Sequence, residues 1–445
     1  MRRTIPKLLA AFLGLCLVAS AFAIDVPLKY QKHPAESEGF YPSGSISLEE
    51  MMEPPPGEWK FPALVSEHPI YAFVKIGDKQ KLCVLDHQVA GSKFYNRFYL
   101  DSNGNGDLTD DPFVEGTVKL AQNNRSYTVA FPGVDTRIEI DGKSIPYSFR
   151  PSIRVRRDQL ERRGFTKESI RRYIVVGLRL NCSYTGEFKI KGQKYRVILG
   201  DSNCNGRFND RFTLVEMKAR DEVRRMPIFS HGDGFIIATE DKIDSSDLQV
   251  CGDWLVVEDT LFEVSINTAK GKMTLTPMTD NLGALELAMK TERISLYSED
   301  GKHCLVMYRP SKKIKVPAGK YRLYKYQALK KDEQGDLWRL CAWATTESPF
   351  VVVDRKGEVV LEFGEPYPAI VNVIQPRGMS SRALIAFEVE GKGKEMLRDL
   401  SHMSGDKTQI RLSEEEDLGH RPKEPTYKIV KTDGEVVTQG SFEYG

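Results

Sequence analysis

Two short stretches of the sequence, a hundred residues apart, carry oxygen-bearing side chains in a spacing that suits a hard cation. The first reads D-S-N-G-N-G-D-L-T-D-D from Asp101, and the second reads D-S-N-C-N-G-R-F-N-D from Asp201. Both place Asp, Asn and Asn at loop positions 1, 3 and 5, Gly at position 6 and Asp at position 10. Alternate side chains of this kind direct oxygens at one centre, and the glycine permits a sharp turn. The repeated pattern therefore predicts two calcium-binding loops.

Calcium takes about six to eight oxygen ligands, which side chains and one main-chain carbonyl of each loop can supply. In the first loop the predicted ligands are the side chains of Asp101, Asn103 and Asn105, the carbonyl of Asp107, and either Asp110 or Asp111. In the second loop they are Asp201, Asn203, Asn205, the carbonyl of Arg207, and Asp210. Neutral Asn ligands predict weak sites, with dissociation constants of about 10⁻⁴ to 10⁻³ M, so the calcium would be structural. The positive charge of Arg207 predicts the weaker site in the second loop.

Both loops depart from a complete EF-hand, because position 12 holds Pro112 or Phe212 instead of Glu and the flanks have a β pattern. They resemble the EF-hand-like loops of dockerins, of thrombospondin-type calcium repeats and of integrin-type propeller blades, in which Asp closes the loop. The string Y-L-D-S-N-G-N-G-D-L-T-D-D is also similar to one in secreted bacterial proteins built of several β domains. The resemblance implies calcium binding by each loop, and it implies no activity.

Two other interpretations of these residues stay open. D-x-N-x-N-G is also the chemistry of tight turns that bind no metal. Gly200-Asp201-Ser202 resembles the serine block of GDSL-type esterases, in which Ser202 would be the nucleophile, His402 the base and Asp399 its orienting partner. A second D-x-x-H pair is Asp417 and His420. Against the esterase, that family carries its serine block near the mature N-terminus of an α/β fold, whereas here it lies mid-chain in a β pattern.

No other motif points to catalysis, so we expect no catalytic residue and no cofactor besides calcium. The seven histidines show no zinc spacing, and no C-x-x-C is present. A glycan-binding or glycan-hydrolysing protein is the alternative function. Its candidate sugar-stacking face consists of five aromatic residues: Tyr321, Tyr324, Tyr326, Trp338 and Trp343. Alternating aromatic residues in strands belong more often to the core.

The N-terminal segment has the pattern of a cleavable signal peptide. Arg2, Arg3 and Lys7 precede an apolar run from Leu8, and A-F-A ends at Ala23. The run is too short for a stable membrane-spanning helix, so we expect a secreted or periplasmic protein without a transmembrane segment after cleavage. Removing three cations from the 64 Lys and Arg leaves them nearly balanced with the 62 Asp and Glu. This balance gives no indication of a nucleic-acid partner.

Six of the seven cysteines follow the signal peptide, and their wide spacing defines no disulfide framework. Cys304 and Cys341 are the pair to test first, since both fall on predicted strands of one domain. Buried free thiols are the alternative.

The rest of the sequence consists mostly of short strand patterns separated by turns, with one Arg-rich helical stretch. We predict a mainly β fold of several small β-sandwich or β-barrel-like domains in series, the first two a weak internal duplication, with a short helical connector. The predicted parts are a signal peptide (1–23), a Pro-rich N-terminal arm (24–58), a β unit with the first calcium loop (59–150), an Arg-rich connector (151–172), a β unit with the second calcium loop (173–282), a β-sandwich (283–372) and a small C-terminal β domain (373–445).

These observations together predict an exported, modular, calcium-binding β protein with a binding or scaffolding role at the cell surface or in the periplasm. Calcium is the expected ligand, and a cell-surface glycan or protein is the expected class of partner.

Overall fold

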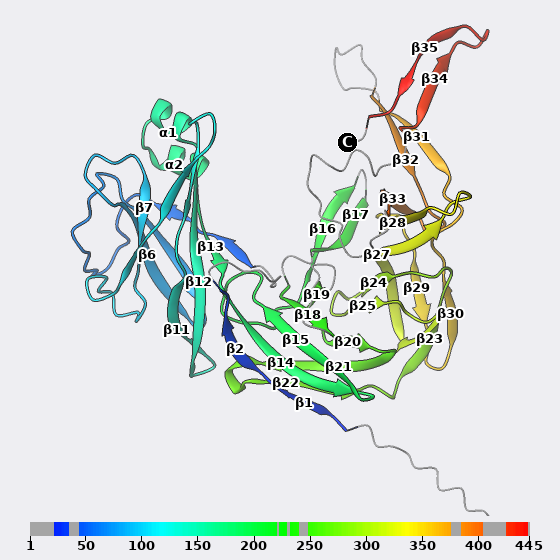
Figure 1. The fold of residues 1–445 in the computed structure, drawn as a ribbon, viewed down its shortest axis with the longest axis horizontal. Helices are drawn as coiled ribbons and strands as arrows, with labels where there is room; N and C mark the ends of the chain where they lie inside the picture. Colours follow the sequence, from blue (N-terminus) through cyan, green and yellow to red (C-terminus); the bar gives the residue numbers. More distant parts are fainter. Residues whose placement is uncertain are drawn as a thin grey trace, which may run out of the picture.

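The fold is taken from a computed structural model, which describes residues 22–34, 44–219, 222–228, 232–239, 248–374, 384–403 and 424–443. It is 57% strand and 5% helix, which confirms the predicted mainly β class. Figure 1 shows three groups of sheets along the chain, from the group below α1 and α2 to the group that contains β27. Residues 1–21 of the predicted signal peptide (1–23) and the pair Asp417 and His420 lie outside the described residues. Within the described part, no helix is long and apolar enough to cross a membrane.

The first group, which we call the first sandwich, has one sheet in the order β4-β5-β6-β7-β8 and another in the order β3-β13-β12-β10-β9, with β11 beside β12. Phe98 of β7 contacts Phe131 and Phe149 across the two sheets, with ring centroids 6.2 and 6.3 Å apart. The strands are β3 (Ser45–Ser47), β4 (Glu50–Met51), β5 (Ile70–Ile76), β6 (Lys79–His87), β7 (Tyr95–Leu100), β8 (Phe113–Glu115), β9 (Thr117–Leu120), β10 (Tyr127–Ala130), β11 (Val134–Ile140), β12 (Lys143–Val155) and β13 (Ile174–Leu180).

The helical connector consists of α1 (Arg157–Arg163) and α2 (Lys167–Tyr173), as the sequence predicts. Thr166 and Ser169 form a reciprocal capping box that starts α2. The connector joins two neighbouring strands of the same sheet. β12 and β13 are antiparallel partners, and Phe149 pairs with Leu180. Residues 174–180 therefore belong to the first sandwich, although the sequence analysis assigned them to the unit that begins at 173.

The second sandwich has one sheet in the order β19-β18-β15-β14-β2 and another in the order β1-β22-β21-β20. A 3-10 turn at Thr268–Lys270 connects β21 to β22. The strands are β1 (Ile24–Pro27), β2 (Lys29–Lys32), β14 (Cys182–Ile190), β15 (Gln193–Gly200), β18 (Gly234–Ala238), β19 (Leu248–Val250), β20 (Trp254–Val257), β21 (Thr260–Asn267) and β22 (Lys272–Pro277).

The N-terminal arm provides an edge strand to four different sheets. β1 pairs with β22, β2 with β14, β3 with β13, and β4 with β5. Each of these short strands covers an edge that would otherwise expose unpaired main-chain groups. The arm thereby ties the first sandwich to the second.

The third sandwich has a small sheet in the order β26-β23-β30, in which β23 and β30 are parallel, and a larger sheet in the order β25-β24-β27-β28-β33, with β29 beside β27. β33 joins this sheet through β28, although the sequence analysis placed residues from 373 onward in a separate unit. Its strands are β23 (Leu282–Leu287), β24 (Arg293–Ser298), β25 (Cys304–Tyr308), β26 (Lys313–Pro317), β27 (Gly319–Lys331), β28 (Leu337–Ala344), β29 (Phe350–Val353), β30 (Glu358–Leu361) and β33 (Glu395–His402).

Three further hairpins flank the sandwiches. They are β16 (Thr213–Ala219) with β17 (Glu222–Ile228), β31 (Ala369–Ile374) with β32 (Leu384–Val389), and β34 (Thr426–Val430) with β35 (Val436–Ser441). One continuous apolar core extends through the first and second sandwiches, and a separate one fills the third.

The predicted duplication is visible in the strand pairs that lead into the two loops. Val84 pairs with Tyr99 before the first loop, and Tyr184 pairs with Leu199 before the second. Each strand of the second pair thus lies one hundred positions after its counterpart in the first pair, and the two pairs have the same register. The strands that follow the loops differ, because β8 pairs with β7. After the second loop, β16 pairs with β17, and β15 pairs instead with β18.

All six cysteines after the predicted signal peptide are free thiols. The pairing of Cys304 with Cys341, which the sequence analysis left open, is therefore not formed, and the free-thiol alternative holds. Cys304 lies on β25 and Cys341 on β28, and β24 and β27 separate these strands in the sheet.

Candidate metal centres in the two loops

The first loop begins directly after β7 with Asp101, which is only 2% exposed. Its carboxylate accepts hydrogen bonds from the main-chain N–H groups of Gly104 at 2.7 Å, Asn105 at 3.1 Å and Gly106 at 3.2 Å. Gly106 has a φ of 80°, a left-handed conformation that glycine adopts without strain. The chain therefore wraps around the Asp101 carboxylate, as a position-1 ligand requires.

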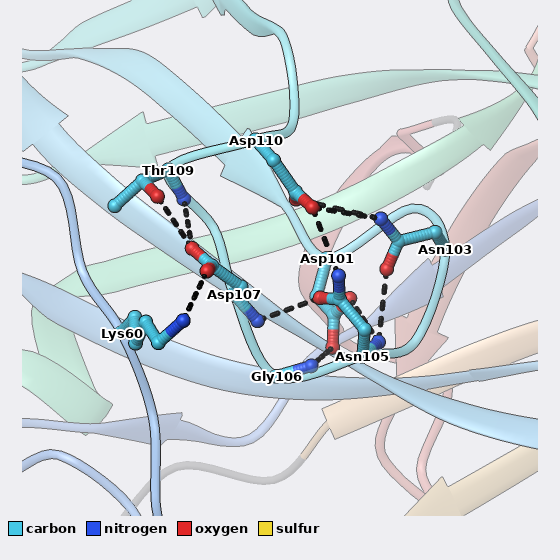
Figure 2. Close-up of polar contacts among 8 residues, drawn as sticks. All are labelled: Lys60, Asp101, Asn103, Asn105, Gly106, Asp107, Thr109 and Asp110. Atoms are coloured by element: carbon cyan, nitrogen blue, oxygen red, sulfur yellow. Dashed lines mark hydrogen bonds and ion pairs between the residues drawn. The ribbon is translucent and has the colours of Figure 1, made fainter.

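The predicted side chains at positions 3, 5 and 10 gather over Asp101 (Figure 2). The Asn105 amide nitrogen donates to Asp110 Oδ2 at 2.9 Å, and the Asn103 amide nitrogen lies 3.4 Å from Asp110 Oδ1. Asn103 Oδ1 accepts from the Asn105 N–H at 2.9 Å. The four side chains therefore face a common point.

Two of the predicted first-loop residues turn their carboxylates elsewhere. Asp107 contacts Lys60 Nζ at 2.8 Å (Figure 2), and hydrogen bonds from Lys60 and Thr109 lower the pKa of Asp107 to about 2. This leaves its carbonyl as the predicted ligand. Asp111 accepts a hydrogen bond from the Ser102 hydroxyl, and burial raises the pKa of its carboxyl. Of the two residues proposed to close the loop, Asp110 is the one that joins the other predicted ligands.

The second loop repeats this geometry with residues that are more deeply buried. Asp201 is fully buried and accepts from the N–H groups of Gly206 at 2.6 Å and Asn205 at 3.1 Å. The amide nitrogens of Asn203 and Asn205 donate to Asp210 Oδ2 at 2.8 and 2.5 Å. All four predicted side-chain ligands are again together.

Position 7 of the second loop also turns its side chain outward. Arg207 donates to Asp78 at 2.8 Å and lies 3.3 Å from Asp141, and both acids belong to turns of the first sandwich. The Gly77 N–H donates to the Asn205 carbonyl at 2.6 Å. The second loop is therefore docked on the first sandwich. The first loop holds Lys60, in the segment between β4 and β5, in a similar way, through main-chain bonds from the Lys60 N–H to the Gly106 carbonyl and from the Leu108 N–H to the Lys60 carbonyl.

Two residues of the second site are not evident from the sequence. The Tyr147 hydroxyl on β12 donates to Asp201 Oδ2 at 2.8 Å. Asp233 accepts from the N–H groups of Ser202 and Asp210, both at 2.8 Å. Neither belongs to the loop motif. Tyr147 lies on β12, and Asp233 directly precedes β18. The Asp-Gly pair at 233 was the only local signal.

The second site concentrates negative charge in a buried position. Burial raises the pKa of Asp201, and the charge of Asp210 adds to this effect. Burial and the charges of Asp201 and Asp210 likewise raise the pKa of Asp233. A divalent cation would offset the burial and repulsion of these carboxylates. The two loops thus offer the carboxylate and amide groups that calcium prefers, and in the second loop a cation would offset buried negative charge.

The described residues include no group of three or more His, Cys, Asp or Glu side chains that could hold a metal. The predicted set of each loop is of another kind, because it combines two carboxylates with two amides and a carbonyl.

In the described part of the chain, the acid and the base of the esterase interpretation do not contact each other. Asp399 contacts Arg339 at 3.1 Å and accepts from the Ser401 hydroxyl at 2.7 Å. The His402 imidazole lies 3.8 Å from Asp336. The predicted base and its orienting acid therefore have other partners.

The predicted sugar-stacking residues divide between different environments. Tyr321 and Tyr326 are buried in the core of the third sandwich. Trp343 is 48% exposed and lies 6.1 Å from Tyr324, while Trp338 donates to Asp332. The five aromatic residues do not form one face.

Comparisons with protein-family models, curated proteins and solved structures find no match to this chain.

Proposed function

We propose that this chain is an exported, modular β protein in which two weakly held calcium ions stabilise the joints between its parts, and which serves in binding or scaffolding at the cell surface or in the periplasm. The observation that carries the proposal is the convergence of the position 1, 3, 5 and 10 side chains in both loops. Turn chemistry alone accounts for the glycines and the Asn residues, but it does not require the closing Asp110 and Asp210 to return to the same point.

The role of the ions follows from what the loops hold. The first loop fixes the segment between β4 and β5 at Lys60, and the second connects the first sandwich to the second through Asn205 and Arg207. A site with ten times as much free calcium as its dissociation constant would stabilise the fold by about 1.4 kcal/mol. Export supplies a compartment in which millimolar calcium can fill such sites.

Chelation tests the proposal directly. We expect EDTA to lower the melting temperature of the mature protein, and added calcium to restore it. Asp101→Ala and Asp201→Ala should each remove part of that difference, because each deletes the central ligand of one loop. Asp135→Ala is the matched control, since Asp135 is an exposed partner of Lys32 outside both loops.

Calorimetric titration of calcium into the EDTA-stripped protein should show two weak sites, and each loop variant should lose one. A melting temperature that does not respond to EDTA, together with no heat of calcium binding, would contradict the proposal. Export is checked separately, by N-terminal sequencing of the mature chain, which should begin after Ala23.

A further inference from the structure

A cavity of about 410 Å³ lies between the second and third sandwiches, beside the second loop. Its walls come from β18 and β19 on one side and from β24, β25 and β27 on the other, and Ser202 of the loop lines it as well. Figure 1 shows β19 next to β24 and β25 near the centre of the molecule. The volume falls within the range of pockets that bind small molecules.

A β-bulge aims two consecutive side chains of β27 at this cavity. The register between β24 and β27 shifts between Ser295, which pairs with Lys325, and Leu296, which pairs with Leu323. Leu323 and Tyr326 on either side face the core, whereas Tyr324 and Lys325 both line the cavity. Bulges are often found beside functional sites, where they redirect side chains.

The charge of the cavity lining is entirely positive among the described residues. Lys325 and Arg293 line it, and no Asp or Glu of the described chain does. Burial and the charge of Arg293 lower the pKa of Lys325, and no carboxylate contributes to this shift. Lys325 forms no ion pair with a described residue; its ammonium lies 5.9 Å from the ring of Tyr324. A largely buried lysine without a carboxylate partner is costly, and an anion would offset that cost.

A hydroxyl group beside Lys325 lacks a partner as well. Ser295 is 2% exposed, and its Oγ forms no hydrogen bond within the described residues. Because Ser295 pairs with Lys325 across β24 and β27, the two residues are neighbours on the cavity wall. Buried polar groups are normally satisfied, so an unsatisfied hydroxyl next to a lysine without a carboxylate partner points to a missing acceptor.

We propose that this cavity binds a small oxyanion-bearing molecule, with the oxyanion held by Lys325 and Ser295 and the body of the ligand against apolar side chains. The apolar part of the lining is supplied by Leu248, Val250 and Val306. A carboxylate attached to a ring or a short apolar body fits this combination better than an inorganic ion does. The site is independent of the calcium loops, because none of its binding groups is a predicted calcium ligand.

Benzoate and inorganic phosphate are suitable probes, because the first carries an apolar ring and the second does not. We expect saturation-transfer NMR to show saturable benzoate binding to the calcium-loaded protein, and phosphate to compete with it more weakly. Lys325→Met should weaken benzoate binding about tenfold or more, because it removes a buried charge from the pair. Lys320→Met is the matched control on the same strand, since Lys320 is half-exposed and paired with Glu299.

A second measurement keeps the proposal testable if Lys325→Met does not fold. Reductive ¹³C-methylation of the lysines gives a resonance for Lys325, assigned with Lys325→Arg, and benzoate should shift its titration to higher pH. Binding of neither probe, or benzoate binding that leaves both the Lys325 resonance and the Lys325→Met affinity unchanged, would overturn the proposal. Phosphate binding as tight as that of benzoate would overturn the assignment of an apolar body.

Discussion

The hydroxyl of Tyr147 reaches the second loop from a strand 54 positions earlier in the chain and donates to the buried Asp201 carboxylate. Tyr147→Phe removes this donor and leaves a buried acceptor with fewer hydrogen bonds. We expect it to lower the free energy of unfolding by about 1.5–3 kcal/mol, measured by urea denaturation in the presence of calcium.

The chain provides a matched control for Tyr147→Phe. Tyr184 is also buried, but its hydroxyl has no hydrogen-bond partner among the described residues. Tyr184→Phe should therefore change stability little or raise it slightly. Equal losses in both variants would show that the Tyr147 bond to Asp201 contributes nothing specific.

Glu395 predicts a pH dependence of stability in the third sandwich. It is fully buried, accepts from the Gly364 N–H at 2.5 Å and from the Tyr326 hydroxyl at 3.2 Å, and burial raises the pKa of its carboxyl. Its contribution to stability is fully present below the pKa of the unfolded chain and is lost as the pH rises through the folded pKa.

Glu395→Gln removes this titration, so the variant should gain stability relative to the natural protein as the pH rises from about 4 to 8. Melting temperatures measured across that range check the trend. The exposed Glu435→Gln is the control and should show no such trend. A constant difference between the natural protein and Glu395→Gln would disprove the prediction.

At the scale of elements, the second loop is pressed against the first sandwich, whereas the tip of the first loop is open. A Cβ added at Gly206 would lie 2.4 Å from Ile138 Cδ1 and 3.0 Å from the Gly77 nitrogen, at a φ of 89°. A Cβ added at Gly104 would meet nothing within 4 Å, at a φ of 76°. The two positions therefore share left-handed strain and differ in packing.

Gly104→Ala should cost about 1–2 kcal/mol from backbone strain alone. Gly206→Ala should cost about 2–4 kcal/mol, because the overpacking at Ile138 and Gly77 is added to the strain. Chemical denaturation of both variants measures the difference. Equal costs would mean that the second loop is not held against the first sandwich in solution.

At the scale of the whole molecule, the second loop contributes Phe208 to the core that the first and second sandwiches share, and the first loop contributes Leu108 to a smaller cluster on the first sandwich. The third sandwich has its own core. Chelation should therefore loosen some parts of the chain and leave others unchanged. We expect EDTA to raise amide hydrogen exchange at Lys60, at Gly77 and through both loops, since the loops hold these main-chain groups.

β27 and β28 in the third sandwich are the internal reference for this experiment and should exchange at the same rate with and without EDTA. A uniform increase over all three sandwiches would indicate general destabilisation instead. No increase at the loops would remove the structural role assigned to calcium.

The sequence by itself determined the features that depend on local spacing. Alternation of Asp and Asn with a glycine at position 6 predicts which side chains converge, because neighbours in a tight loop are placed by a few backbone angles. The same holds for the short helical connector, because the residues that cap its helix at Lys167–Tyr173 lie within one turn.

Only the tertiary structure decided which distant strands pair, and with that the surroundings of each site. Tyr147 and Asp233 join the second loop through strands that no local pattern links to it. Lys325 faces a cavity because of a bulge, although its neighbours suggest simple alternation. The physical reason is that strand pairing depends on the fit of whole faces and edges, which residues far apart in the sequence determine together.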